Sequence, residues 1–388
     1  MPIINRLGDM QPEIAAWRQD LHAHPETMFD VHRTAASVQE KLKAFGCDQV
    51  VPGIGRTGVV GVIRGRKGSS GKVIGLRADM DALPIEEQSE LPYKSTVPGK
   101  MHACGHDGHT AMLLGAAKYL AETRNFDGTA VVIFQPAEEG GGGGREMVKD
   151  GMMDRFGIQE VYGLHNWPGM PIGSFAIRSG PVMAAADRIH IDIEGKGSHA
   201  AKPHEGIDTI LVGSQLVNLI QSIASRNVDP LEAAVVSITQ FHAGSADNII
   251  PQTAFLRGTA RTLSPAVRDL VEKRLNEIVV GVAKLHGATA KLTYLRDYPV
   301  TVNHERETGF AAAVASEVAG SERVKTDVAP VMGAEDFSFM LEERPGAYIF
   351  MGNGDTANLH HPAYNFNDEA LPFGSSYFVR LVEKAMPA

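Results

Sequence analysis

TAVVIF, residues 129–134, is an unbroken apolar run in the first half of a chain of 388 residues. Such a run is typical of a central strand that is buried on both faces, in a sheet with helices on either side. Further strand patterns occur at residues 58–65, 72–79 and 160–164, and helical patterns at residues 13–24, 33–46 and 113–121. Because strands that alternate with helices build α/β domains, the sequence predicts an α/β fold with a mostly parallel sheet and flanking helices.

The pattern changes near Asp187, where DRIHIDIEGKG (187–197) alternates like a half-exposed strand. From there the predicted order is β-α-β-β-α-β, which is the order of a ferredoxin-like unit. Its length of about 110 residues suits a small independent domain. After residue 298 the α/β pattern resumes and ends in a helix. We therefore predict a main domain built from residues 1–186 and 298–388, with a ferredoxin-like α+β domain inserted at 187–297.

The composition excludes several classes of protein. Hydrophobic residues make up 43% of the chain and charged residues 21%, as in a globular protein, and the net charge is −9 without a basic block. This charge argues against nucleic acid or an anionic membrane as the partner. The N-terminus lacks a signal-peptide pattern, no apolar stretch approaches the ~20 residues of a membrane span, and two cysteines cannot form a disulfide framework. We expect a cytoplasmic protein.

Metal-ligating residue types gather near the ends of the predicted strands. MHACGHDGH (101–109) places three histidines and one cysteine in nine positions, in a chain with 15 histidines in all. Other candidates follow strands or lie late in the chain: Asp79, Asp81, Glu138, Glu139, His165, His360 and His361. Since the carboxyl ends of parallel strands meet at one edge of the sheet, these side chains can converge there.

Each candidate has an ordinary structural explanation when it is taken alone. A single cysteine such as Cys104 is more often a small buried hydrophobe, and a single histidine such as His165 is usually a hydrogen-bonded structural residue. The glycines of EEGGGGG (138–144) lack the Gly-Lys-Ser/Thr ending of a phosphate loop, so they more simply let the backbone pass close to a crowded site. The joint pattern of Cys-x-His, Glu-Glu, His and His nevertheless favours a metal centre.

Seven motifs carry a resemblance to a known family: GLRADMDALPI, MHACGHDGHTAMLLGAAKYL, FQPAEEG, GLHNWPGMPIG, GSHAAKPHEGIDTI, NIIPQTAFLRGTART and MGAEDFSF. They resemble the aminoacylase/carboxypeptidase metallopeptidase family, in the amidohydrolase branch of hippurate hydrolases, N-acyl-amino-acid amidohydrolases and plant auxin-conjugate hydrolases. The match runs in order from about residue 14 to residue 384. The resemblance implies a phosphorylase/hydrolase-like catalytic domain with two divalent metal ions. It also implies that the insert is a lid through which a homodimer or homotetramer forms.

The resemblance assigns the metal ligands residue by residue. Cys104 would bridge the two ions as a thiolate, and the remaining ligands would be His106, Glu139, His165 and His360. Thiolate and imidazole suit Zn²⁺, carboxylates admit Mn²⁺, and Ni²⁺ or Co²⁺ are alternatives. Wider relatives carry His-x-Asp where this chain reads Arg77-Ala78-Asp79. That departure leaves Asp79 to orient a ligand histidine, and Asp107 is a candidate for similar work.

The predicted chemistry is hydrolysis of an amide. Two divalent ions ~3.5–4 Å apart polarise a carbonyl and lower the pKa of a bound water. Glu138, which stands beside a ligand, is predicted to take the proton of this water and to return it to the departing amine, although it could instead be a further ligand. The resemblance implies that His199 of the insert stabilises the oxyanion that forms from the amide carbonyl in the partner subunit's active site.

Two further residues of the insert are assigned to the substrate. Asn248 and Arg261 are expected to hold a carboxylate, for which the paired donors of arginine are suited, and the alternative for Arg261 is a surface salt bridge. The sequence leaves four other histidines between structural and functional roles: His22, His24, His204 and His361.

Three functions compete for this site. The leading hypothesis is an amidohydrolase that releases a free amino acid from a small N-acyl amino acid. The first alternative is a dipeptidase or carboxypeptidase with the same metals, whose pocket must accept an α-amine. The second is a metal-bound interaction protein without activity, which loss of Glu138 or of a ligand would have favoured; neither is lost.

Overall fold

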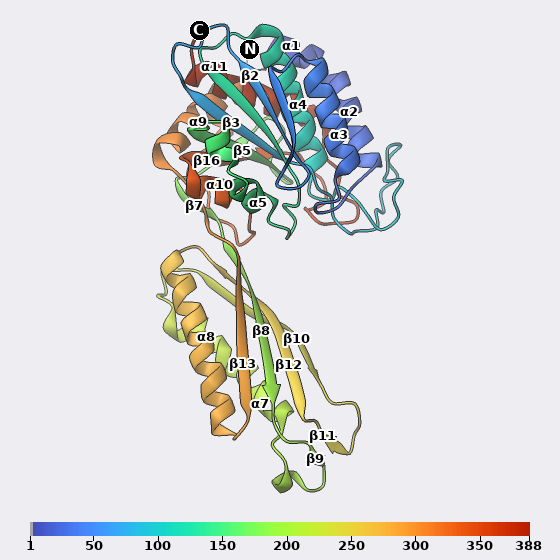
Figure 1. Cartoon of the computed structure of the whole chain (residues 1–388), viewed down its shortest axis with the longest axis vertical. Helices are drawn as coiled ribbons and strands as arrows, with labels where there is room; N and C mark the ends of the chain where they lie inside the picture. Colours follow the sequence, from blue (N-terminus) through green and yellow to red (C-terminus); the bar gives the residue numbers. More distant parts are fainter. Residues whose placement is uncertain (1–2) are drawn as a thin grey trace. The chain divides into compact units, whose positions relative to one another are not determined.

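The computed structural model describes residues 3–388 and divides into two compact units. The first unit comprises residues 3–182, Val302–Ala329 and Asp336–Ala388, and the second comprises Met183–Thr301 and Pro330–Glu335. Segments far apart in sequence therefore share the first unit, as the blue and red elements of Figure 1 show.

The first unit is built on one eight-stranded sheet of order β1-β2-β4-β3-β5-β16-β6-β15. Its strands are β1 (Gln49–Ile54), β2 (Gly58–Arg64), β3 (Val73–Asp79), β4 (Thr129–Gln135), β5 (Glu160–Trp167), β6 (Phe175–Ala176), β15 (Val324–Lys325) and β16 (Gly346–Gly352). The central strands β4, β3, β5 and β16 run parallel, while β1 and β2 pair antiparallel at one side. The apolar run at residues 129–134 lies in β4, which is buried on both faces after its first residue. The predicted fold class is confirmed.

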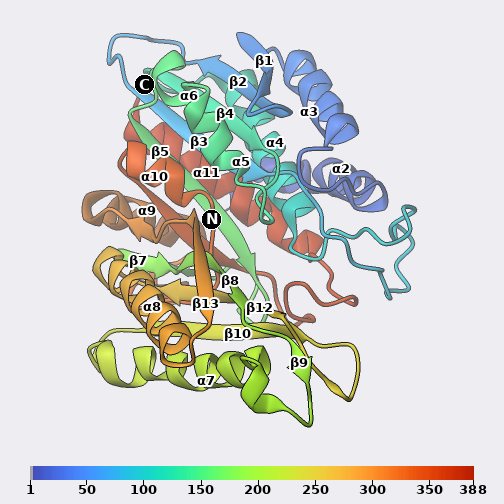
Figure 2. The same cartoon turned by 60° about the horizontal axis from the view of Figure 1, so that its bottom comes forward.

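Helices cover this sheet: α1 (Asn5–Asp9), α2 (Gln11–Ala23), α3 (His32–Ala44), α4 (His106–Thr123), α5 (Gly143–Lys149), α6 (Met152–Arg155), α9 (Glu305–Ala319), α10 (Ser338–Glu343) and α11 (Leu371–Ala385). Helix α4 packs against α2 and α11 and is buried almost all round, as its alanines, leucines and glycines predict (Figure 2). Among the described residues, no helix combines the length and the apolar character needed to cross a bilayer.

The second unit is a four-stranded antiparallel sheet with helices on one face. The strands β8 (Ala185–Glu194), β10 (Ala234–Ala243), β12 (Thr253–Thr262) and β13 (Thr289–Tyr298) lie in the order β10-β12-β8-β13. Helices α7 (Thr209–Ser222) and α8 (Pro265–Leu285) bury Ile189, Ile191 and Ile193 of β8, while Asp192 and Glu194 are exposed. The chain order is the predicted β-α-β-β-α-β.

Short elements complete the description. They are β7 (Gly180–Met183), β9 (Ser198–His199), β11 (Ile249–Ile250) and β14 (Thr301–Asn303), the 3₁₀ turns at Pro203–Glu205, Ser321–Arg323 and Asp368–Ala370, and a π turn at Ile223–Asn227. Strand β9 pairs with β11, and β14 pairs with β7.

Candidate metal centre

The predicted ligands of the first unit converge at the carboxyl ends of its parallel strands. Cys104, His106 and His165 place one donor atom each within 4.8 Å of one another, and so do Cys104, Glu139 and His360. Cys104 belongs to both groups. Two overlapping groups that share one thiolate are the arrangement needed for two neighbouring cations with a bridging ligand.

The side chains of the cluster lie close to one another. Cys104 Sγ lies 3.4 Å from His165 Nε2. Glu139 Oε1 lies 3.3 Å from His360 Nε2 and 3.9 Å from His106 Nε2. The Nε2 atom of His106 is buried and has no hydrogen-bond partner in residues 3–388. A buried, unpaired nitrogen that faces a thiol and a carboxylate fits a metal ion.

The electrostatics of the cluster also favour a cation. Burial, together with the charges of Glu139, Glu138 and Asp79, holds the pKa of the Cys104 thiol well above its usual value. Burial alone would lower the pKa of His106, but Asp79, Asp81 and Glu139 outweigh it and raise the pKa to about 10. Each shift reports surplus negative charge, which a divalent ion would neutralise while it deprotonates the thiol.

The two histidines of the first group present Nε2 because their other nitrogen is occupied. His106 donates from Nδ1 to the main-chain oxygen of Asp81 at 2.8 Å. His165 donates from Nδ1 to the main-chain oxygen of Asn166 at 2.7 Å, and burial, with His109 nearby, holds its pKa well below the usual value. Nε2 of His165 therefore carries a lone pair. Nε2 of His106 carries one once a metal ion replaces its proton.

Asp81 orients the two glutamates that follow β4. Its carboxylate accepts hydrogen bonds from the main-chain N–H groups of Glu138 at 2.9 Å and Glu139 at 3.1 Å. The turn before them is strained, because Ala137 has a positive φ of 54°. Gly143 is required there, since any Cβ would collide with the carbonyl oxygen of Pro136. The glycine run therefore serves close backbone approach, as the sequence predicts.

Glu138 lies beside the cluster. It is 7% exposed, and its carboxylate lies within 4.8 Å of a ring nitrogen of His106 and of the carboxylate of Glu139. The Glu138 carboxylate is therefore within reach of a molecule bound at the cluster.

Asp79 and Asp107 each bond a histidine that is not among the predicted ligands. Asp79 Oδ1 lies 2.7 Å from His109 Nδ1, whereas its nearest approach to the predicted ligand His106 is 3.7 Å, beyond hydrogen-bond distance. Asp107 bonds His22 Nδ1 at 2.8 Å instead of a predicted ligand. Of the two histidines in the first turn of α4, only His109 therefore lies within hydrogen-bond distance of Asp79. Sequence reasoning noted His109 in its motif but gave it no role.

The histidines that the sequence left between structural and functional roles lie in different environments. His22 is fully buried and bridges Asp107 and Glu87, which ties α2 to the start of α4. His360 has a φ of 65° and turns its ring to Glu139, while the ring of His361 accepts from the main chain of Ala363. His24 and His204 are exposed.

The second unit brings together two of its three predicted site residues. His199 pairs with Ile249 across β9 and β11, and the N–H of Ala200 donates to the carbonyl oxygen of Asn248 at 2.9 Å. Both side chains are exposed. Arg261 pairs with Ala186, eight residues along β12 from Thr253 and therefore about 26 Å away from the end at which β11 lies.

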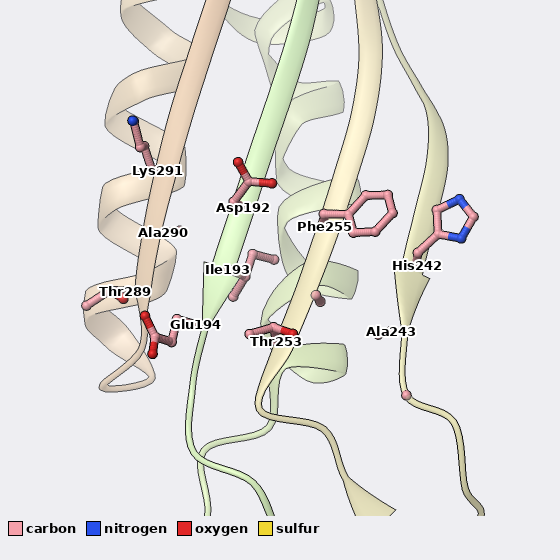
Figure 3. Close-up of a pocket in the computed structure, with 12 residues that line it drawn as sticks. Asp192, Ile193, Glu194, His242, Ala243, Thr253, Phe255, Thr289, Ala290 and Lys291 are labelled. Atoms are coloured by element: carbon pink, nitrogen blue, oxygen red, sulfur yellow. The ribbon is translucent and has the colours of Figure 1, made fainter.

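The same unit carries a groove of about 610 Å³ on its sheet (Figure 3). Phe255 stacks on His242 with ring centroids 4.7 Å apart, and the guanidinium of Arg257 lies 4.8 Å from the Phe255 ring. None of the predicted site residues lines this groove.

The chain is similar to a known protein family and to several of its members. The model of peptidase family M20/M25/M40 matches residues 75–384. The chain belongs to this family. It is 44% identical to the hippurate hydrolase of Campylobacter jejuni over 387 residues, with 99% of each chain covered. It is 42% identical to thermostable carboxypeptidase 2 of Saccharolobus solfataricus over 361 residues, with 91% of this chain and 90% of the relative covered.

A solved structure of an M20 member agrees with these relatives. The YXEP protein of Bacillus subtilis, described as a dinuclear metal binding peptidase, superposes with a TM-score of 0.85 at 34% identity, covering 98% of this chain and 99% of that one. The predicted family, its amidohydrolase branch and the prediction of a hydrolytic enzyme are confirmed. The matched residues of this M20 chain include all five candidate ligands and Glu138.

Proposed function

We propose that this chain is a metal-dependent amidohydrolase that cleaves N-acyl amino acids into a carboxylic acid and a free amino acid. The observation that carries the proposal is the pair of donor groups that share Cys104, with Glu138 buried beside them. The hippurate hydrolase relative supports the substrate class, since hippurate is the amide of benzoic acid with glycine.

The donor set fits two divalent ions. Cys104, His106 and His165 would hold one ion, and Cys104, Glu139 and His360 the other. The mixture of thiolate, imidazole and carboxylate suits Zn²⁺ or Mn²⁺, with Ni²⁺ and Co²⁺ as alternatives. When bound, the ions supply Lewis-acid polarisation of the amide carbonyl and a water of lowered pKa.

Glu138 moves the protons of the reaction. Its carboxylate accepts a proton from the attacking water and delivers it to the nitrogen of the departing amino acid. Asp81 keeps Glu138 in place by accepting a hydrogen bond from its main-chain N–H. A buried carboxylate held in this way meets the geometric requirement for a general base.

His199 donates a hydrogen bond to the oxyanion. The N–H of Ala201 donates to His199 Nδ1 at 3.1 Å, so the neutral ring carries its proton on Nε2 and can donate it. Asn248, directly before β11 of one subunit, and Arg261 on β12 of the other subunit hold the carboxylate of the substrate, because in one chain the two lie at opposite ends of the sheet.

The position of His199 supports action in a second copy of the chain. The chain enters and leaves the second unit beside Ala186 and Tyr298, which pair with each other at one end of the sheet. His199 follows the opposite end of β8, about 30 Å away along the strand. A homodimer or homotetramer that forms through this unit would bring His199 and Asn248 to the partner's metal centre, while Arg261 stays at the connected end.

A dipeptidase or carboxypeptidase is the second candidate, and the Saccharolobus carboxypeptidase relative supports it. One experiment separates the two. The chain is stripped with a chelator, reloaded with Zn²⁺, Mn²⁺, Co²⁺ or Ni²⁺ singly, and assayed for amino-acid release from benzoyl and acetyl amino acids and from dipeptides. The proposal expects the acyl amino acids to have the higher kcat/KM. Faster release from the dipeptides would favour the alternative, and no release with any metal would contradict both.

A further inference from the structure

Asn166 links two of the candidate metal ligands. It directly follows His165 and is fully buried. Its side-chain nitrogen donates to the carbonyl oxygen of Cys104 at 2.7 Å, and its own carbonyl oxygen accepts from His165 Nδ1 at 2.7 Å. The hydroxyl of Tyr364 donates to Asn166 Oδ1 at 2.7 Å. A shift of Asn166 would therefore displace both the thiol of Cys104 and the ring of His165.

His109 anchors Asn166 from the first turn of α4. Its Nε2 accepts the main-chain N–H of Asn166 at 2.9 Å, and this N–H belongs to the peptide bond that leaves His165. The side-chain nitrogen of Asn166 lies 3.0 Å from the same Nε2. Since Nε2 accepts, the proton of the neutral ring lies on Nδ1, which donates to Asp79 Oδ1 at 2.7 Å. Both nitrogens of this buried ring are occupied.

Asp79 is held in turn by Arg77. The guanidinium donates from Nη1 to Asp79 Oδ2 at 2.7 Å, and also to Gln135 Oε1 at 2.9 Å and Asp336 Oδ1 at 3.1 Å. Arg77, Asp79 and Asn166 are each at most 1% exposed. These hydrogen bonds thus connect β3, α4 and β5, and the residues that make them are buried.

We infer that His109 is a positioning residue, which with Asp79 and Asn166 fixes Cys104 and His165 in their metal-binding geometry without itself binding metal. The inference rests on the proposed metal centre and deepens it. The alternative is that His109 is a ligand, because Asp79, His106 and His109 also place donor atoms within 4.8 Å of one another. The bond from Asn166 N–H to Nε2 argues against this alternative, since it uses the lone pair that a metal would need.

Two substitutions of His109 separate its contacts. An asparagine amide falls near the position of Nδ1, so His109→Asn keeps a partner for Asp79 but loses the acceptor for Asn166. A glutamine amide falls near Nε2, so His109→Gln keeps that acceptor. We expect His109→Asn to weaken Co²⁺ affinity about 10–100-fold in competition with a chelator, and His109→Gln to recover most of this loss.

The spectrum of the Co²⁺ protein reports the ligands themselves. At saturating Co²⁺ we expect both variants to bind as many ions as wild type and to keep the thiolate-to-cobalt absorption band in place. A lower stoichiometry or a shifted band in both variants would overturn the inference and make His109 a ligand. These measurements need no substrate, so they remain decisive if the chain fails to hydrolyse acyl amino acids.

Tyr364→Phe provides a milder variant in case the buried substitutions impair folding. It removes only the hydroxyl that donates to Asn166 Oδ1, and we expect a loss of Co²⁺ affinity of a few fold. The unfolding temperature of each metal-free variant is measured alongside. Lower unfolding temperatures with unchanged Co²⁺ affinity across the three variants would show a purely structural role and contradict the inference.

Discussion

Cys104, His106 and His165 lie buried in the first unit, whereas His199 and Asn248 stand exposed at one end of the second. Asp81 and Asn166 accept hydrogen bonds from the rings of His106 and His165, and the Asn166 amide donates to the carbonyl oxygen of Cys104. The His199 ring accepts a hydrogen bond from the main-chain N–H of Ala201, two residues away. The candidate ligands are thus held in place by the first unit alone. The proposed role of His199 and Asn248 requires a second surface beside them.

The strands on which these residues lie differ in the same way. β4 is buried on both faces because helices cover both sides of its sheet, and the ends of such strands can hold charged groups away from water. β8 alternates between buried and exposed residues because helices cover only one face of its sheet. Four predictions test this contrast, from the largest effect to the smallest.

Glu138→Gln should lose several orders of magnitude in kcat while it keeps both metals. The amide is close in size to the carboxylate but cannot accept the proton of the attacking water. Turnover of a benzoyl amino acid and metal content are measured on the same preparation. Substantial activity in the metal-loaded variant would remove Glu138 from the role of base.

Cys104→Ala should lose metal and activity together, because it removes the donor that both groups share. Cys47→Ala is the matched control, since Cys47 belongs to neither donor group and packs against the hydrophobic core. Metal content, activity and unfolding temperature are compared. If the two variants retain equal amounts of metal, the bridging assignment is wrong.

His199→Ala should lower turnover about 10²–10³-fold, the usual cost of a missing oxyanion donor, with the metals retained. Mixing it with Glu138→Gln after dissociation and reassociation tests whether the two residues act across subunits. A mixed dimer then has one site without either defect, and part of the activity returns. Mixed dimers that form but stay inactive would show that His199 acts in its own chain or not at all.

His22 should make the stability of the metal-free protein depend on pH. Burial alone would lower its pKa, but Asp107 and Glu87 outweigh burial and raise the pKa from 6.5 to about 9. A raised pKa means that this contribution is complete below pH 6.5 and is lost as the pH rises through 9. The loss amounts to about 3 kcal/mol.

Urea unfolding at pH 6 and pH 10 measures this loss, with His22→Asn and His24→Asn compared to wild type. His22→Asn should show a weaker pH dependence than wild type, and the part that remains includes the contribution of His106, whose pKa is also raised. The exposed variant, His24→Asn, should follow the wild-type curve. Equal pH dependence in all three proteins would contradict the role of the buried ion pair.

Sequence alone determined the fold class and the residue types of the candidate centre. The period of the apolar residues identifies strands and helices, and parallel strands bring their carboxyl ends to one edge. Cys104, His106, Glu139 and His165 could therefore be placed together from the sequence, and the family resemblance added His360.

Only the tertiary structure decided which groups hold these ligands. Asp79 meets His109 across 30 residues of sequence, and Asn166 meets His109 across 57 and Cys104 across 62. No local pattern specifies such pairs, because the rotation of α4 about its axis, set by packing against α2 and α11, selects which histidine faces Asp79. Likewise, sequence placed His199, Asn248 and Arg261 in one domain, but the antiparallel register of β8 and β12 separates Arg261 from the other two. Strand length sets that distance, and a linear sequence does not reveal to which end of the folded sheet each residue comes.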